Sequence, residues 1–130
     1  MKSLIALLLL ISLLTPQSKA DVLTEGWYKL LLGQQHIGYI VQRFELNKKK
    51  NQVQMTSFLR TNALGGDITE SIQANSTVGF EPISFQYSIL KGKDATLIDA
   101  NFTGDQSVVK VTEKGGKLQT FRDKIPKGTF

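Results

Sequence analysis

The chain has 130 residues, with 16 Lys+Arg, 11 Asp+Glu, one His and no Cys, and this length predicts a single domain. The lack of cysteine excludes disulfides, a thiol nucleophile and thiolate metal sites. One histidine is too few for a zinc site that uses two or three histidines.

The first twenty residues have the pattern of a secretory signal peptide. Lys2 supplies the positive start, and residues 4–14 form an eleven-residue apolar run in which only Ser12 is polar. This run is shorter than the roughly 20 residues that cross a bilayer, so we expect no transmembrane span after cleavage. The small residues that end the segment predict cleavage between Ala20 and Asp21, although an uncleaved N-terminal anchor is the alternative. The protein is therefore expected to be exported, either periplasmic or secreted.

Cleavage would remove two lysines and leave 14 Lys+Arg against 11 Asp+Glu, a net charge of +3 for residues 21–130. The densest basic cluster, Lys48–Lys50, has no aromatic or arginine residue interleaved with it. We interpret it as a solvated turn and expect no nucleic-acid partner.

Short segments rich in Val, Ile, Phe, Tyr and Thr then alternate with clusters of Gly, Asn, Asp and Lys, a spacing typical of all-β folds. Eight segments are predicted to be strands: 27–32, 36–46, 52–62, 68–76, 82–90, 95–102, 107–113 and 117–125. Nearly every gap between them contains a glycine, which can adopt the positive φ of a tight hairpin turn.

Period-2 alternation indicates that one face of each strand is apolar and the other polar. In the fifth segment the two faces carry Ile83, Phe85, Tyr87 and Ile89 and, opposite them, Ser84, Gln86 and Ser88. The third segment alternates in the same way, except that Phe58 falls on its polar side. One-sided strands without crossover helices predict an antiparallel meander, either a curved sheet or a partly open barrel of about eight strands.

We expect residues 21–130 to form one β-domain with a buried apolar face and a core of its own. The sequence ends on an aromatic residue directly after the last predicted strand, and such meanders often need further strands or a helix to close them. We therefore expect the gene product to continue past Phe130.

The first hairpin combines Trp27 with Gly38, a glycine placed where a side chain would obstruct a neighbouring backbone or ring. His36, beside the turn, is expected at a surface or sheet edge. The candidates for facing an apolar ligand are Trp27, Phe58, Phe85 and Tyr87, and the alternative is that these side chains fill a packed core.

No motif indicates catalysis. The chain has no Gly-x-Ser-x-Gly elbow, and the carboxylate pairs Asp67 with Glu70 and Asp94 with Asp99 each include a residue in or next to a turn. We therefore predict no catalytic, cofactor-binding or metal-binding residues, and no cofactor.

Five short stretches together resemble a known type of module. They are Gly26-Trp27-Tyr28 with Gly33, Ile37-Gly38-Tyr39, Asn62-Ala63-Leu64-Gly65, Phe80-Glu81-Pro82-Ile83-Ser84-Phe85 and Lys124-Ile125-Pro126. Across residues 26–126 the chain resembles the N-terminal β-rich module of exported bacterial proteins, some of which carry a transglutaminase-like domain downstream. It is also similar to uncharacterised periplasmic β-domain families.

The resemblance implies a non-catalytic module of the cell envelope, because no cysteine is present to match a transglutaminase core. We expect a binding or accessory role, with an envelope protein or an apolar small molecule as partner. Two alternatives stay open: the N-terminal module of a longer transglutaminase- or peptidase-like enzyme, and a periplasmic carrier of a lipid or other apolar ligand.

Overall fold

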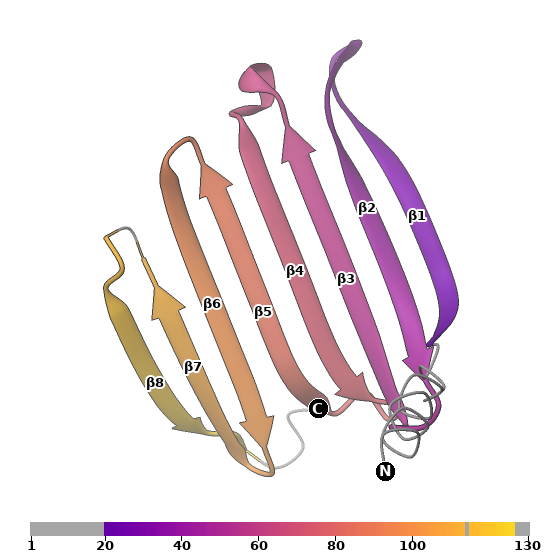
Figure 1. The fold of residues 1–130 in the computed structure, drawn as a ribbon, viewed down its shortest axis with the longest axis vertical. Coiled ribbons are helices and arrows are strands. Elements are labelled where there is room, and N and C mark those ends of the chain that lie inside the picture. Colours follow the sequence, from indigo (N-terminus) through magenta and orange to yellow (C-terminus); the bar gives the residue numbers. More distant parts are fainter. Residues whose placement is uncertain (1–19, 114, 127–130) are drawn as a thin grey trace, which may run out of the picture.

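The computed structural model describes residues 20–113 and 115–126, so the predicted export segment, apart from Ala20, lies outside the described residues. The strands form one antiparallel sheet in which each strand pairs with the next along the chain (Figure 1). They are β1 (Asp21–Leu32), β2 (Gln35–Asn47), β3 (Gln52–Thr61), β4 (Ile68–Thr77), β5 (Pro82–Lys91), β6 (Asp94–Thr103), β7 (Gln106–Thr112) and β8 (Leu118–Lys124). The predicted all-β antiparallel meander is confirmed. It is not closed into a barrel, since β1 and β8 form its two edges.

The strands β2 to β8 agree with the sequence prediction to within one residue at each end, whereas β1 does not. The prediction that the first strand begins at Trp27 is wrong, because β1 begins at Asp21. Residues 21–26 pair with the second half of β2, and the register shifts between Val22 and Thr24. Residues 21–26 show no alternation of their own, so they join β1 because they pair with the long strand β2.

The register of the seven strand pairs assigns the side chains to two faces, because directly paired residues point to the same side of a sheet. We call the first the apolar face. Its apolar members are Tyr28 and Leu30 of β1, Ile40, Phe44 and Leu46 of β2, Val53, Met55 and Leu59 of β3, Ile68, Ile72 and Ala74 of β4, Ile83, Phe85, Tyr87 and Ile89 of β5, Ile98, Ala100 and Phe102 of β6, Val109 and Val111 of β7, and Phe121 of β8. The opposite side, which we call the polar face, carries mainly amide, hydroxyl and charged side chains.

A short 3-10 helix, η1 (Ala63–Gly65), connects β3 to β4. The Asn62 side chain caps it by accepting hydrogen bonds from the backbone N–H groups of Leu64 and Gly65, at 3.1 and 3.3 Å. Gly65 lies against the side chain of Thr61, which belongs to the apolar face, and a Cβ on Gly65 would be 2.6 Å from the Thr61 Cβ. The helix η1 therefore covers one end of the apolar face.

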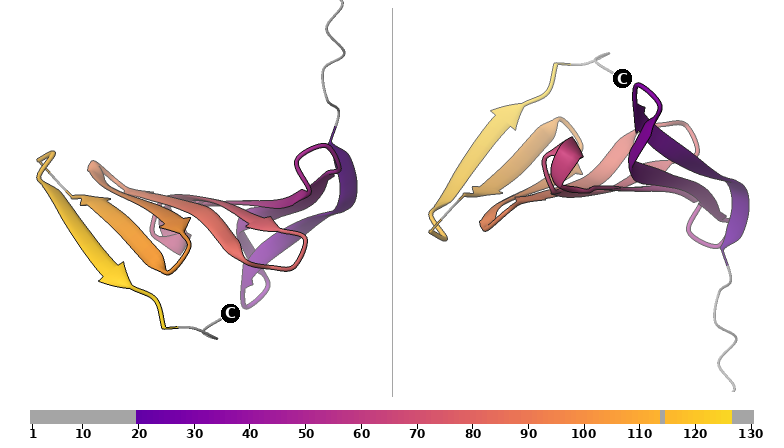
Figure 2. Two further views of the ribbon diagram at one scale, coloured as in Figure 1. Left: turned by 90° about the horizontal axis from the view of Figure 1, so that it is seen from below. Right: turned by 90° about the horizontal axis from the view of Figure 1, so that it is seen from above.

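The sheet is bent, and β8, η1 and the tip of the β1–β2 hairpin lie toward the same side of it (Figure 2). Because η1 packs on the apolar face, that face is the concave one. The side chains of a concave face crowd one another. This explains why the large apolar side chains that β5 and β6 place on that face are half-buried, whereas Leu90, Ala95 and Leu97 of the polar face are exposed.

The expected core is absent from the part of the chain that the structure describes. Its buried residues are Gly38, Thr61 and Ala100, and the other apolar side chains are half-buried or exposed. The prediction of a buried apolar face is therefore corrected to a half-buried one, because these residues form a single layer with no second layer across it. No helix within 20–113 or 115–126 is long and apolar enough to cross a membrane.

Candidate functional site

The four residues predicted to face an apolar ligand do not share one surface. Phe85 and Tyr87 lie on the apolar face, where they pair with Ala74 and Ile72 of β4. Trp27 and Phe58 lie on the polar face, on either side of Val41 in the same row. The structure thus separates these residues into two candidate sites, one on each face of the sheet.

The apolar face carries one hydrogen-bonded polar pair near its centre. The hydroxyl of Tyr87 donates to Oε2 of Glu70 at 3.0 Å, and both side chains are half-buried. Burial raises the pKa of the Tyr87 phenol above its ordinary value, and the hydrogen bond and negative charge of Glu70 raise it further. A surface of aliphatic and aromatic side chains with a single fixed polar pair can hold an apolar molecule and orient one polar group on it.

This pKa shift predicts a specific loss of stability in alkali. Because the folded state holds the Tyr87 proton more tightly than the unfolded state, stability present below pH about 10 falls as the pH rises through the folded-state pKa. Urea midpoints measured between pH 9 and 11 should decrease more steeply for the wild type than for Tyr87→Phe. Tyr28→Phe, at an exposed tyrosine, is the matched control and should keep the wild-type slope. Equal slopes for all three proteins would contradict this role of Tyr87.

The polar face carries three aromatic rings in contact, which we call the aromatic strip: Trp27 of β1, Tyr39 of β2 and Phe58 of β3. The rings of Trp27 and Tyr39 are stacked, with centroids 6.4 Å apart and an interplanar angle of 23°. The rings of Tyr39 and Phe58 are 6.0 Å apart and tilted by 40°. Trp27 is 70% exposed, so the strip is open to solvent at the β1 end.

Trp27 is held by a network of charged side chains. Its indole Nε1 donates to Oε1 of Glu25 at 3.1 Å, and Arg43 binds the other oxygen of Glu25 at 3.4 Å and Oε1 of Glu45 at 2.5 Å. Arg43 is therefore neutralised by two carboxylates, and the network limits the rotation of the Trp27 ring.

Two further cations flank the strip. Lys29 and Arg60 pair directly with Tyr39 from the two neighbouring strands, so the three side chains form one row across the polar face. Both cations are exposed, and no carboxylate of residues 20–113 or 115–126 forms an ion pair with either. The aromatic strip thus lies beside two cations whose charge is not neutralised by a described partner.

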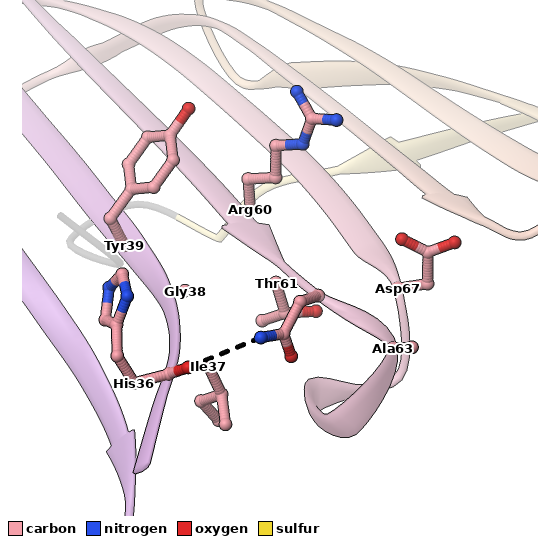
Figure 3. A pocket seen from close by; sticks show the side chains of 9 residues that line it. His36, Ile37, Gly38, Tyr39, Arg60, Thr61, Ala63 and Asp67 are labelled. Atoms are coloured by element: carbon pink, nitrogen blue, oxygen red, sulfur yellow. Dashed lines mark hydrogen bonds between the residues drawn. The ribbon is translucent and has the colours of Figure 1, made fainter.

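A shallow hollow of about 380 Å³ continues from the aromatic strip to the end of the sheet. The side chains of Tyr39, Arg60 and Asp67 extend to the same side of it (Figure 3). The Asn62 side chain, also in its lining, donates to the carbonyl oxygen of His36 at 3.3 Å. His36 is exposed at the end of the first hairpin, as predicted.

Sequence reasoning did not identify Lys29, Tyr39, Arg60 or Asp67 as site residues. The available signal was Phe58, an aromatic residue on the polar side of its strand. The register that places Tyr39 between Trp27 and Phe58 could not be obtained from the alternation of any single strand. In the described ranges no group of three or more His, Cys, Asp and Glu side chains could hold a metal ion.

Comparison with protein-family models, with curated proteins and with solved structures finds no match to this chain.

Proposed function

We propose that the protein is an exported, non-catalytic binding module of the bacterial cell envelope, and that the apolar face is its binding surface. The observation that carries this proposal is an apolar face to which all eight strands contribute, over which the described residues place no second layer. Extended apolar surface of this kind marks a binding site for an apolar ligand or partner, since each Å² removed from water contributes about 25 cal/mol.

Export and the envelope location are supported by two features of the sequence. Residues 1–20 have the charge, apolar length and small-residue ending of a signal peptide. The pattern of glycines and aromatic residues over 26–126 resembles the N-terminal modules of exported bacterial proteins. Both features favour a periplasmic or secreted protein.

A carrier of a lipid or another apolar small molecule is the form of this function that the geometry favours. The face is concave and mainly aliphatic, so the crowded side chains can surround an acyl chain on one side. The Glu70 carboxylate and Tyr87 hydroxyl provide the polar contact that would fix the ligand's orientation. A carboxylate at this point favours a lipid whose polar group donates a hydrogen bond.

A fluorescent fatty-alcohol probe tests the proposal on the purified protein, together with native mass spectrometry to detect a ligand retained through purification. Phe85→Ser removes an aromatic side chain from the proposed surface and should weaken probe binding about tenfold or more. Leu97→Ser removes an apolar side chain from the polar face of the neighbouring strand and should change the affinity less than twofold. A protein that retains no ligand and binds no probe, or equal losses in the two variants, would contradict the proposal.

A further inference from the structure

We propose that the aromatic strip, with Lys29 and Arg60 beside it, is a binding surface for an acidic glycan, a polysaccharide that carries carboxylate groups on its sugar rings. The surface lies on the polar face, on the opposite side of the sheet from the apolar face. Its function is therefore separate from the proposed binding of an apolar ligand.

The aromatic strip has the geometry that sugar rings require. The C–H groups on one side of a pyranose ring carry partial positive charge and stack on the negative face of an aromatic ring. Trp27 and Tyr39 lie on adjacent strands with their ring planes within 23° of parallel, and Trp27 is 70% exposed, so its ring is open to a sugar at the β1 end of the strip. The contact of Trp27 with Glu25, which is itself bound by Arg43, holds the platform in place before the ligand arrives.

Charge complementarity indicates that the glycan is acidic. Lys29 and Arg60 flank Tyr39 in one row, roughly 10 Å apart across two strand spacings. A guanidinium can bind a carboxylate through two parallel hydrogen bonds, and an ammonium attracts it as a point charge. The third cation at the strip, Arg43, is already neutralised by Glu25 and Glu45. The two cations available to a ligand are therefore Lys29 and Arg60, which lie on either side of a sugar stacked on Tyr39.

The rest of the polar face favours a glycan over a nucleic acid. Single-stranded nucleic acid also stacks on aromatic rings, but its regular phosphates need cations that continue along the groove. Beyond Arg60 the polar face continues through the neutral side chains of β4 and β5. These are Thr69, Ser71, Gln73, Asn75, Ser84, Gln86, Ser88 and Leu90, of which Leu90 alone is apolar. Amides and hydroxyls both donate to and accept from sugar hydroxyl groups, whereas they carry no positive charge to neutralise a row of phosphates.

The hollow beside the strip supplies the remaining polar contacts. Asp67 and His36 line it next to Arg60, where a carboxylate can accept hydrogen bonds from sugar hydroxyls. Because the hollow is continuous with the ring of Tyr39, a glycan stacked on the aromatic strip extends toward the end of the sheet.

Trp27 is the only tryptophan of the chain and therefore reports directly on this surface. Titration of the full protein with oligomannuronate is expected to change the Trp27 emission and to saturate, whereas a neutral glucan of equal length should bind about tenfold more weakly. Lys29→Gln combined with Arg60→Gln should remove this preference, because both exposed cations become neutral. Lys110→Gln, an exposed lysine on the polar face of β7, is the matched control and should bind as the wild type does.

Tyr39→Ala should weaken oligomannuronate binding about tenfold, by loss of one stacking partner. If Tyr39→Ala fails to fold, the double variant Lys29→Gln/Arg60→Gln still tests the proposal, since both side chains are exposed. Phe85→Ser should retain glycan binding, which separates this result from the test of the apolar face. No change in Trp27 emission, equal binding of the neutral glucan, or tighter binding of an oligo-dT strand than of oligomannuronate would overturn the proposal.

Discussion

Replacing Gly38 with alanine is expected to lower the free energy of unfolding by about 2–4 kcal/mol. Gly38 is buried, and a Cβ placed on it would collide with the carbonyl oxygen of Arg60 and lie 2.9 Å from the Cα of Thr61. Both obstacles are backbone of the neighbouring strand β3, so no rotation of a side chain can relieve the clash. The strands would have to separate, at the point where Ile37 accepts the 2.8 Å hydrogen bond of the Asn62 N–H.

Urea denaturation of Gly38→Ala against Gly79→Ala measures this effect. Gly79 has a negative φ, and the nearest atom to its added Cβ is Thr77 Oγ1 at 3.6 Å, so its variant should stay within about 0.5 kcal/mol of the wild type. Similar stabilities for the two variants would show that β2 and β3 do not approach as closely at Gly38 as the structure indicates. Because Gly38 also lines the hollow, oligomannuronate binding should weaken in the destabilised variant.

The order and positions of the strands were predictable from sequence because each strand carries its own signal. In β5 the alternation of apolar and polar residues identifies the strand. Most turns contain a glycine, such as Gly33, whose φ is 63°. The start of β1 lacked such a signal. Residues 21–26 are extended by pairing with β2, and this pairing depends on the length of the partner strand rather than on their own pattern.

Alternation assigns residues within a strand to two faces, but it does not say how the faces of different strands match. Trp27 and Phe85 were grouped as candidates because both are aromatic residues in strands, yet the register places them on opposite faces. Phe58 breaks the alternation of its strand, and this already indicated an aromatic residue on the polar side. Its association with Trp27 and Tyr39 required the pairing of three strands, which a single sequence does not encode locally.

Whether an apolar face is covered is also not a local property. The alternation that predicted a buried face would be the same for a sheet packed against a second layer and for one that binds a ligand. In this structure Ala100 is the only apolar residue of the described strands, glycine aside, that is buried, and the large side chains around it are half-buried. The two faces thus differ in chemistry, one aliphatic and concave, the other polar with an aromatic strip, and each proposal rests on one face alone.

Replacing Thr61 with valine is expected to destabilise the protein by about 2–3 kcal/mol, although the two side chains have nearly the same shape. Thr61 is 8% exposed, and its hydroxyl donates to the carbonyl oxygen of Gly65 at 3.0 Å and accepts from the backbone N–H of Ile68 at 2.9 Å. One hydroxyl therefore joins the end of β3 to both η1 and the start of β4.

Valine would leave the carbonyl of Gly65 and the N–H of Ile68 without this partner, and η1 would lose its attachment to the sheet. Thr61→Ser keeps the hydroxyl and should recover more than half of the loss, which separates the hydrogen bonds from the methyl group. Thr56→Val, in the same strand but on the polar face, is the matched control and should change stability by less than about 0.5 kcal/mol. A Thr61→Val protein as stable as Thr56→Val would show that the hydroxyl does not fasten η1 to the sheet.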